Sequence, residues 1–398
     1  MSLETFDVVV VGGGPAGATA AHESTLFGRR VLLLDRAWRV KPCGGAVPPQ
    51  LLEDFEVPPE LLVNRVTSAR MISPSHVHVD MPTGRGYVGM VDREQFDEWL
   101  RARAVRQGAQ RRTGTFTQLT RDDDGTAIVH YTEGRSRQGR AAAVRARAVI
   151  GADGALSQVA RQCIRGADQA RYVFAYHEIL ESPAAGASDA YAPERCDVFY
   201  EGRFSPDFYA WVFPHGGTIS VGTGTLRQGF DMKGAVATLR AETGLDAART
   251  IRREGAPIPL QPLPRWDNGR DVVLAGDAAG VVAPASGEGI FYAMTGGRLA
   301  ADAVESMLSG GGGRSLASAR RRFMKAHGQV FRVLDIMQRF WYSSDDRRER
   351  FVAICKDLDV QRLTFEGYMY KQLVKAEPLA HARIFLKNIG HLTGLVRV

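Results

Sequence analysis

Residues 8–21, VVVVGGGPAGATAA, indicate the fold of the N-terminal part of this 398-residue chain. Phe6–Val11 is a continuous apolar run, as expected of a parallel strand that is buried on both faces. A glycine turn, Gly12–Gly17, follows it, and Pro15–Phe27 carries small residues at helical spacing. Val31–Leu34 is a second apolar run. The order strand, glycine turn, helix, strand predicts a Rossmann-like dinucleotide-binding fold.

Three glycines of this turn have distinct roles in such a fold. Gly12 permits the turn, Gly14 lets the backbone approach a pyrophosphate, and Gly17 lets the helix pack close to the strand. The helix N-terminus offers N–H groups and a positive dipole end to the phosphates. Asp35 ends the second strand, where a carboxylate can accept hydrogen bonds from ribose hydroxyls. The cofactor-binding residues predicted in this region are Gly12, Gly14, Pro15, Ala16, Gly17, Asp35 and Arg36.

A second glycine-rich motif lies near the other end of the chain, in DVVLAGDAAGVVAPASGEGI, residues 271–290. A buried strand runs into Asp277, and a glycine cluster with Gly287 and Gly289 then opens a helix. A dehydrogenase that uses only NAD has no need of this motif, whereas a flavin does. Asp277 can hydrogen-bond the ribityl hydroxyls or bridge to phosphate through water, and the helix N-terminus can face the flavin edge that becomes negative on reduction. We therefore expect FAD as the cofactor.

A third motif, Gly151-Ala-Asp153-Gly154 with Ser157 behind it, follows the apolar strand Ala146–Ile150. It predicts another strand-to-turn contact near the dinucleotide, with Asp153 as the binding residue. By itself this motif is weak, and a structural turn is an equal alternative.

The rest of the chain alternates between sheet and helix signals. Thr67–Tyr87 and Arg171–Thr225 alternate like antiparallel strands, and Val91–Gln107 has a helical pattern. Ala109–Ile150 predicts a small antiparallel appendage, and Ser309–Ser315 predicts a glycine-rich linker before a helical C-terminal region.

Composition sets limits on the class of protein. The hydrophobic fraction of 44% is ordinary for a globular protein, and the formal net charge is +7. The four cysteines are scattered without metal-ligand spacing, which favours a reducing compartment and no metal site. There is no signal peptide and no apolar run of about 18 residues, so we expect a cytoplasmic protein. Apart from the net charge, no motif supports nucleic-acid binding.

The three motifs, in this order and spacing, resemble the glutathione-reductase-type FAD fold, in the branch shared with para-hydroxybenzoate hydroxylase. In that branch a helix with the pattern x-Arg-x-x-Phe-Asp-x-x-Leu precedes the appendage, and DREQFDEWL, residues 92–100, matches it. The resemblance implies that Arg93 reaches the FAD, with a solvated helix arginine as the alternative. It also implies an α/β fold with a Rossmann-like FAD domain, an antiparallel-sheet substrate domain and a C-terminal helical region.

Two further segments are similar to the geranylgeranyl reductase family, which saturates isoprenoid double bonds: KPCGGA, residues 41–46, and YAWVFP, residues 209–214. The C-terminal segments 323–351 and 359–373 resemble the chlorophyll and bacteriochlorophyll branch. The resemblance covers essentially the whole chain. It implies NADPH as electron donor and geranylgeranyl-bacteriochlorophyll or geranylgeranyl diphosphate as substrate. Because the sequence lacks the transit peptide of plant members, we expect a bacterial protein of photosynthetic pigment biosynthesis.

These signals predict a discontinuous organisation. The FAD-binding domain is expected at residues 1–70, 88–165 and 265–308, and the antiparallel-sheet catalytic domain at 71–87 and 166–264. Residues 316–398 are expected to form the C-terminal helical region.

Reduction of an isolated alkene needs a hydride, a proton delivered almost with it, and exclusion of water. Cys43, followed by Gly44 and Gly45, is the predicted catalytic thiol beside the flavin, where it could donate a proton, hold the substrate or merely pack. Tyr209 and Trp211 alternate with Phe213 on one strand and therefore share a face that suits a prenyl chain. Ordinary core packing is the alternative for this face. The predicted catalytic residues are Cys43, Tyr209 and Trp211, and Gly44 and Gly45 join Cys43 among the cofactor-binding residues.

Other classes of enzyme share parts of this sequence pattern. An aromatic monooxygenase or halogenase shares the FAD motifs, but no Trp-x-Trp-x-Ile segment is present and residues 41–45 are unlike the hydroxylase pattern. An archaeal-type prenyl-lipid reductase is a further alternative.

The segment 320–341 combines basic residues with an apolar helical face at Phe323, Val330, Leu334, Met337 and Trp341. This pattern predicts either peripheral contact with the photosynthetic membrane or packing as core.

Overall fold

The computed structural model describes the chain except for residues 1–2, 37–40, 85, 135–138, 184–190 and 372–398. The chain divides into two compact units. The first unit comprises residues 1–41, 93–172 and 257–331, and the second comprises residues 42–92, 173–256 and 332–398.

This division differs from the predicted domains in three respects. Residues 166–172 and 257–264, expected in the antiparallel-sheet domain, belong to the first unit. Residues 42–70 and 88–92, expected in the FAD-binding domain, belong to the second unit. The C-terminal helices do not form a separate domain, since residues up to 331 belong to the first unit and the later ones to the second. Physically, residues 42–70 hold strands that pair with the second unit's sheets, which a linear pattern of hydrophobicity does not reveal.

The first unit is built on a six-stranded sheet in the order β1-β2-β8-β9-β10-β16, with β1 also paired to β10. The pairs β2–β8, β1–β2, β1–β10 and β10–β16 are parallel, whereas β9 pairs antiparallel with both β8 and β10. This confirms the predicted parallel core and its antiparallel appendage. The strands are β1 (Thr5–Val11), β2 (Val31–Asp35), β8 (Gln110–Arg121), β9 (Ala127–Glu133), β10 (Ala141–Gly151) and β16 (Val272–Leu274).

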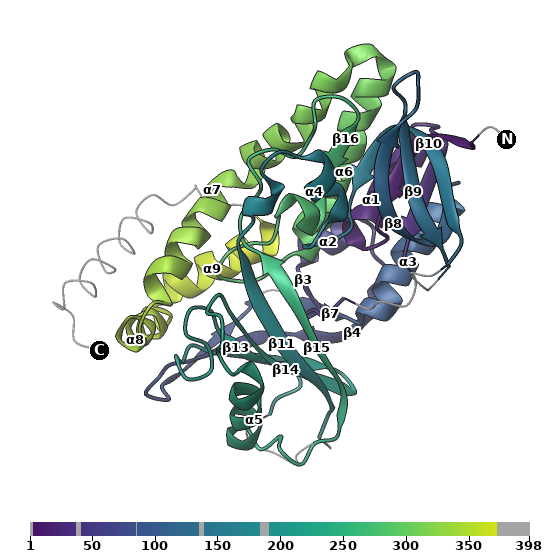
Figure 1. Cartoon of the computed structure of the whole chain (residues 1–398). Helices are drawn as coiled ribbons and strands as arrows, with labels where there is room; N and C mark the ends of the chain where they lie inside the picture. The colour runs from purple at the N-terminus through teal and green to yellow at the C-terminus, as the bar shows by residue number, and fades with distance from the viewer. Residues whose placement is uncertain (1–2, 37–40, 85, 135–138, 184–190, 372–398) are drawn as a thin grey trace. The chain divides into compact units, whose positions relative to one another are not determined.

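The helices of the first unit pack closely on one another, because the residues at their contacts are small. Helix α1 (Pro15–Leu26) contacts both α3 (Arg93–Arg106) and α6 (Ile290–Ser306) (Figure 1). A Cβ built on Gly297 of α6 would lie 2.2 Å from the carbonyl oxygen of Ala16, so only glycine permits this approach. The first unit also contains α4 (Gln158–Cys163), η2 (Ala167–Gln169) and η3 (Gly276–Ala279).

The second unit contains a seven-stranded sheet in the order β15-β11-β14-β13-β12-β5-β6 and a three-stranded sheet, β3-β7-β4. The larger sheet confirms the predicted antiparallel region, although β12 pairs parallel with β5. Helix α5 (Met232–Glu242) lies on one face of it, where Val236 and Leu239 pack with Val212 and Val221 (Figure 1). The strands are β3 (Ala46–Val47), β4 (Leu62–Val66), β5 (Ser68–Ile72), β6 (His78–Pro82), β7 (Val88–Val91), β11 (Tyr172–Glu181), β12 (Arg195–Phe199), β13 (Ala210–His215), β14 (Thr218–Thr225) and β15 (Thr250–Pro259); the short helices are α2 (Pro49–Asp54) and η1 (Pro59–Leu61).

The described C-terminal part is helical, as predicted, in α7 (Ala317–Trp341), α8 (Asp345–Ile354) and α9 (Leu358–Tyr370). The predicted linker at 309–315 is instead a pair of short helical turns, η4 (Met307–Gly311) and η5 (Gly313–Leu316). Gly310 and Gly312 have φ angles of +107° and +65°, so the glycines supply a tight bend between α6 and α7 and do not act as a spacer. The predicted helical region continues into 372–398, which lies outside the described residues.

Candidate nucleotide site and aromatic face

The glycine turn of the first unit has the geometry that a pyrophosphate site requires. Gly12 has a φ of +105°, and a Cβ on Gly17 would lie 1.8 Å from the Gly12 carbonyl oxygen. Helix α1 begins directly after Gly14, and no side chain caps its N-terminus. A Cβ on Gly14 would meet nothing within 4 Å, so there is open space on the side-chain side of this residue. These features fit the phosphates of FAD.

Asp35 lies at the end of β2, next to this turn. Its Oδ1 accepts a hydrogen bond of 3.0 Å from the Gly13 N–H, and its Oδ2 is 3.5 Å from the Arg101 guanidinium. Arg101 also donates to the Gly13 carbonyl at 3.1 Å. The carboxylate therefore holds the turn as well as being available to a ribose. Sequence analysis missed Arg101, although it lies eight residues after Arg93 on the same face of α3.

Arg93 is not a solvated helix arginine, because it is 6% exposed. Its Nε and Nη2 donate to the two oxygens of Asp97, each at 2.8 Å, in a buried bidentate pair one helical turn apart. The pair fixes the guanidinium in one orientation. That Arg93 reaches the FAD stays a prediction.

Asp153 has a structural use that sequence analysis did not foresee. Its carboxylate accepts hydrogen bonds from the Gln158 N–H at 2.7 Å, the Val159 N–H at 3.3 Å and the Ser157 hydroxyl, and so caps the start of α4. Burial raises the pKa of Asp153 despite these hydrogen bonds. The geometry gives weight to the alternative of a structural turn, and cofactor binding by Asp153 stays a prediction.

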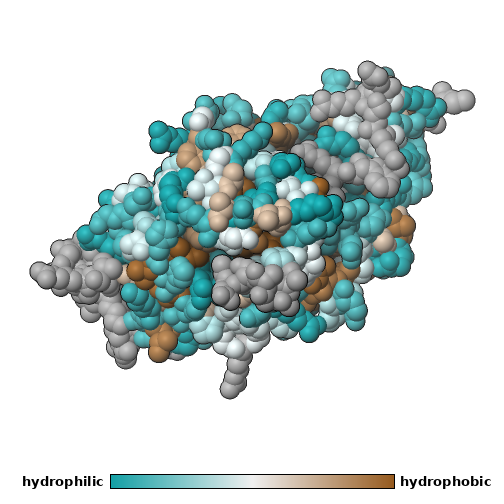
Figure 2. Space-filling model, turned by 90° about the horizontal axis from the view of Figure 1, so that it is seen from below, coloured by the Kyte–Doolittle hydropathy of each residue, from teal (hydrophilic) through white to brown (hydrophobic). Residues whose placement is uncertain are grey.

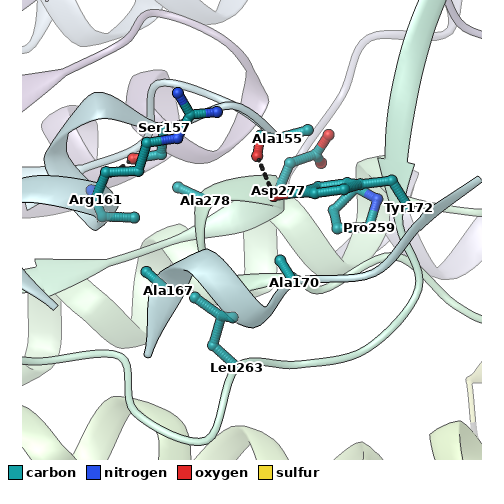
Figure 3. A pocket seen from close by; sticks show the side chains of 12 residues that line it. Ala155, Ser157, Arg161, Ala167, Ala170, Tyr172, Pro259, Leu263, Asp277 and Ala278 are labelled. Atoms are coloured by element: carbon teal, nitrogen blue, oxygen red, sulfur yellow. Dashed lines mark hydrogen bonds between the residues drawn. The ribbon is translucent and has the colours of Figure 1, made fainter. Parts of the chain in front are cut away.

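Asp277 lies in η3, with a side chain only 7% exposed, and forms an ion pair with Lys41. It also lines a small cavity of about 10 Å³, room for about one water molecule. Figure 3 shows Ser157, Arg161 and Tyr172 around the same cavity, where the Tyr172 hydroxyl donates to the Ala155 carbonyl at 3.0 Å. Sequence analysis quoted Lys41 without giving it a role; nothing in a linear pattern shows that it pairs with a residue 236 positions away.

The helix α6 begins after this motif as predicted. Gly289 is its N-terminal flanking residue, with no side-chain cap, and Gly287 has a φ of +67°. A helix end of this kind leaves backbone donors for the flavin edge or for ordered water.

The second unit brings three aromatic side chains together, and we call Tyr209, Trp211 and Phe213 the aromatic face. The ring centroids of Tyr209 and Trp211 are 5.9 Å apart, and those of Trp211 and Phe213 are 6.1 Å apart. The three rings thus share one face of the strand at β13, as their alternation predicts. Tyr209 and Trp211 are 8% and 6% exposed, so they are also part of the core of this unit.

The segment with Cys43 packs on this strand. A Cβ on Gly44 would lie 3.1 Å from the Phe213 ring, and one on Gly45 would lie 2.6 Å from His215 Nε2. Burial, and to smaller extents the neighbouring Tyr342 and Cys43, raise the pKa of Tyr209. The structure therefore brings Cys43, Gly44 and Gly45 to the aromatic face, although these two segments are more than 160 residues apart in the sequence.

His215 has a structural role at the end of β13. It is half-buried, desolvation lowers its pKa, and its Nδ1 is 3.1 Å from the Phe213 carbonyl oxygen. A neutral ring held by the backbone stabilises the end of β13.

Two tyrosines beside the aromatic face were missed. The Tyr200 ring lies 6.2 Å from Tyr209 and 5.2 Å from Tyr342, which follows α7 in the C-terminal segment. Burial raises the pKa of both Tyr200 and Tyr342. No periodicity could link these residues, because they come from separate parts of the chain.

Comparison with known proteins agrees with this fold. A crystal structure of a geranylgeranyl bacteriochlorophyll reductase-like protein from Thermoplasma acidophilum superposes with a TM-score of 0.81 at 21% identity, covering 95% of this chain and 100% of that one. The flavin-dependent brominase Bmp2 superposes with a TM-score of 0.73 at 16% identity, covering 96% of this chain and 99% of that one. A family model described as lycopene cyclase protein matches residues 7–175, less than half of the chain. The chain therefore has the mixed α/β FAD-binding flavoprotein fold.

Sequence similarity gives the family. The chain is 55% identical over 391 residues to a geranylgeranyl diphosphate reductase from Rhodobacter capsulatus, with 98% of each chain covered. The chain belongs to the geranylgeranyl diphosphate reductase family.

Proposed function

We propose that this chain is an FAD-dependent reductase that saturates the isoprenoid double bonds of a geranylgeranyl group in (bacterio)chlorophyll biosynthesis, with NADPH as electron donor. The observation that carries the proposal is the 55% identity along 98% of the chain to a protein named for this reaction. The first unit offers groups that can bind FAD, and the second offers apolar side chains and weak acids.

The first unit offers the binding groups for FAD. Gly12, Gly14 and Gly17 leave the N-terminus of α1 open to phosphates, and Asp35 lies where a ribose binds. Asp277 is a buried carboxylate that can exchange its ion pair with Lys41 for hydroxyl partners. Bound and reduced, FAD supplies the hydride that an isolated alkene requires.

The second unit offers apolar contact and weak acids. In this proposal the prenyl chain packs against the aromatic face, whose apolar rings exclude water from it. Cys43 is half-buried, and Cys43 and Tyr209 each carry a proton that a carbon centre could receive. We assign Cys43 as the first choice of proton donor, because the burial of Tyr209 raises its pKa and makes it the weaker acid.

The experiment follows product mass. Purified protein with FAD and NADPH, kept free of oxygen, is given geranylgeranyl-bacteriochlorophyll in one arm and geranylgeranyl diphosphate in the other. We expect products that gain hydrogens in pairs. A hydroxylated product that forms only with oxygen would indicate a monooxygenase and contradict the proposal. NADH in place of NADPH, with flavin bleaching as the readout, tests the donor.

A second part of the proposal concerns the membrane, where so apolar a substrate partitions. Within the described residues, no helix is both long enough and apolar enough to span a bilayer. The apolar face predicted for docking packs inward instead: Phe323 is fully buried, Trp341 is 8% exposed, and Val330, Leu334 and Met337 are half-buried. Ordinary core packing is thus what the structure supports for that face.

Another part of α7 is exposed. Ile336 is 61% and Val333 is 39% exposed, and the exposed Arg332 and Arg339 neighbour them. Figure 2 shows one side of the molecule, where hydrophobic residues form separate patches among hydrophilic ones. Exposed Ile and Val beside arginines favour peripheral contact with an anionic lipid surface, at roughly 1 kcal/mol for each basic residue near the surface.

Flotation with anionic vesicles at low and high salt tests this contact. Binding at low salt that weakens in Ile336→Ser and in Arg332→Gln supports it. Lack of binding at low salt, or binding indifferent to both changes, contradicts it. Arg322→Gln is the matched control, because that arginine is engaged with Asp302 at 2.6 Å.

A further inference from the structure

A chain of buried hydrogen bonds in the second unit ends on the aromatic face. The indole Nε1 of Trp211 donates to the Ser220 hydroxyl oxygen at 3.0 Å. Ser220 Oγ is 2.9 Å from His177 Nδ1, and His177 Nε2 is 3.0 Å from a carboxylate oxygen of Glu254. The four residues come from the neighbouring strands β13, β14, β11 and β15.

The direction of two links follows from the groups that form them. A carboxylate only accepts, so His177 Nε2 donates to Glu254, and an indole N–H only donates, so Ser220 Oγ accepts from Trp211. Although burial alone would raise the pKa of Glu254, the hydrogen bond from His177 and the charge of Arg252 hold it below the usual value. The carboxylate is therefore ionised at neutral pH and acts as the acceptor that orients the whole chain.

Burial makes these hydrogen bonds directional. Ser220 is fully buried, His177 is 3% exposed and Trp211 is 6% exposed, whereas the Glu254 side chain keeps 17% of its surface. Water does not compete for the inner links, so removing one leaves a buried polar atom without its partner.

The backbone beneath the indole adds a second constraint. Gly222 is the cross-strand partner of both Trp211 and His177. A Cβ on Gly222 would lie 2.4 Å from Trp211 Cζ2 and 2.5 Å from the His177 Cβ. The indole thus lies directly over a glycine, and the Ser220 hydrogen bond fixes its rotation on that surface.

We propose that Glu254, His177 and Ser220 are positioning residues that fix the indole of Trp211 and thereby define the surface on which the prenyl chain binds. This inference rests on the function proposed for the aromatic face. Apolar packing alone would have needed only a phenylalanine at position 211. The Trp211 N–H is tied instead to a polar chain that reaches the partly exposed Glu254.

Ser220→Ala tests the link directly, because it removes the acceptor and little volume. The matched control is Thr223→Val, which removes another buried hydroxyl of β14, one that donates to the Phe204 carbonyl at 2.6 Å on the opposite face. The first readout is the Trp211 indole cross-peak in a ¹H–¹⁵N spectrum, assigned by its absence in Trp211→Phe. We expect an upfield ¹H shift in Ser220→Ala and none in Thr223→Val.

The second readout is prenyl saturation by the FAD-loaded protein. Loss of one buried neutral hydrogen bond predicts a KM for the prenyl substrate raised about threefold to tenfold in Ser220→Ala, with flavin occupancy unchanged. Thr223→Val should keep the wild-type KM. Should Ser220→Ala not fold, Glu254→Ala acts at the partly exposed end of the chain and should shift the same cross-peak less, with Glu254→Gln restoring it.

Three results would overturn the inference: an unmoved cross-peak in both the Ser220 and Glu254 variants, a moved cross-peak with wild-type KM, or equal effects in Thr223→Val. Failure of the proposed function has a different signature. In that case Trp211→Phe itself would leave the KM unchanged, while the cross-peak would still respond to Ser220→Ala.

Discussion

The glycine turn of the first unit and the aromatic face of the second are built in opposite ways. At residues 12–17 the site consists of backbone: glycines that allow a turn, a helix end without a cap, and open space above Gly14. At the aromatic face the site consists of side chains held by other side chains, as Ser220 holds Trp211. A backbone site depends on a short run of residues, whereas a side-chain site depends on residues scattered along the chain.

The largest effect is expected where the backbone is most crowded. Gly17→Ala places a methyl group 1.8 Å from the Gly12 carbonyl oxygen, and the turn must open to admit it. We expect a loss of stability of several kcal/mol, on the order of the larger single-residue effects. Thermal unfolding measures it, and a melting temperature equal to that of the wild type would show that the turn is not as tight as described.

Gly14→Val should separate cofactor binding from folding. A side chain there meets no protein atom within 4 Å, and the φ of −73° suits any residue. The added atoms would instead occupy the space of the pyrophosphate. We expect a folded protein with a flavin absorbance near zero; full flavin occupancy in this variant would refute the assigned phosphate site.

Cys43→Ala tests the second unit at the residue assigned to proton delivery. Reduction of the flavin by NADPH should persist, while prenyl saturation slows by a factor of about 10² to 10⁴, the usual range for general acid catalysis. Stopped-flow bleaching and product mass measure the two steps in one preparation. Unchanged saturation would mean that Cys43 only packs against its neighbours.

A smaller effect, the difference in reactivity toward an alkylating reagent, distinguishes the two half-buried thiols, Cys43 and Cys163. Burial raises the pKa of Cys163 to about 11, so at pH 8 only about one molecule in a thousand carries the reactive thiolate there. Mass spectrometry after brief iodoacetamide treatment at pH 8 should find Cys43 modified and Cys163 spared. Cys163 should become reactive only as the pH approaches 11, and equal labelling at pH 8 would contradict this.

The sequence predicted the first unit better than the second, because a site made of backbone depends on a short run of residues. The strands β1, β2 and β16 and the start of α1 follow from local apolar runs and glycines, within a residue or so of the structure. The alternation of Tyr209 and Trp211 likewise predicted their common face. These features depend on neighbours in the sequence.

What could not be predicted depends on tertiary contacts. Asp153 is a local exception: it looked like a ligand by its place in a motif, yet its carboxylate accepts the N–H groups five and six residues further on, at the start of α4. The apolar stripe of α7 could lie on lipid or on protein, and only the packing of Phe323 and Trp341 decides which. The links from Trp211 to Glu254 follow from strand order, which no single segment contains.

The most direct test of the central claim is prenyl saturation by Trp211→Ala in a flavin-replete preparation. We propose that the first unit binds the cofactor and that the aromatic face of the second binds the prenyl chain. We expect a wild-type flavin spectrum and wild-type bleaching by NADPH, with kcat/KM for saturation lowered about 10- to 100-fold by the lost apolar contact. A variant that keeps its flavin and saturates the prenyl chain at the wild-type kcat/KM would contradict it.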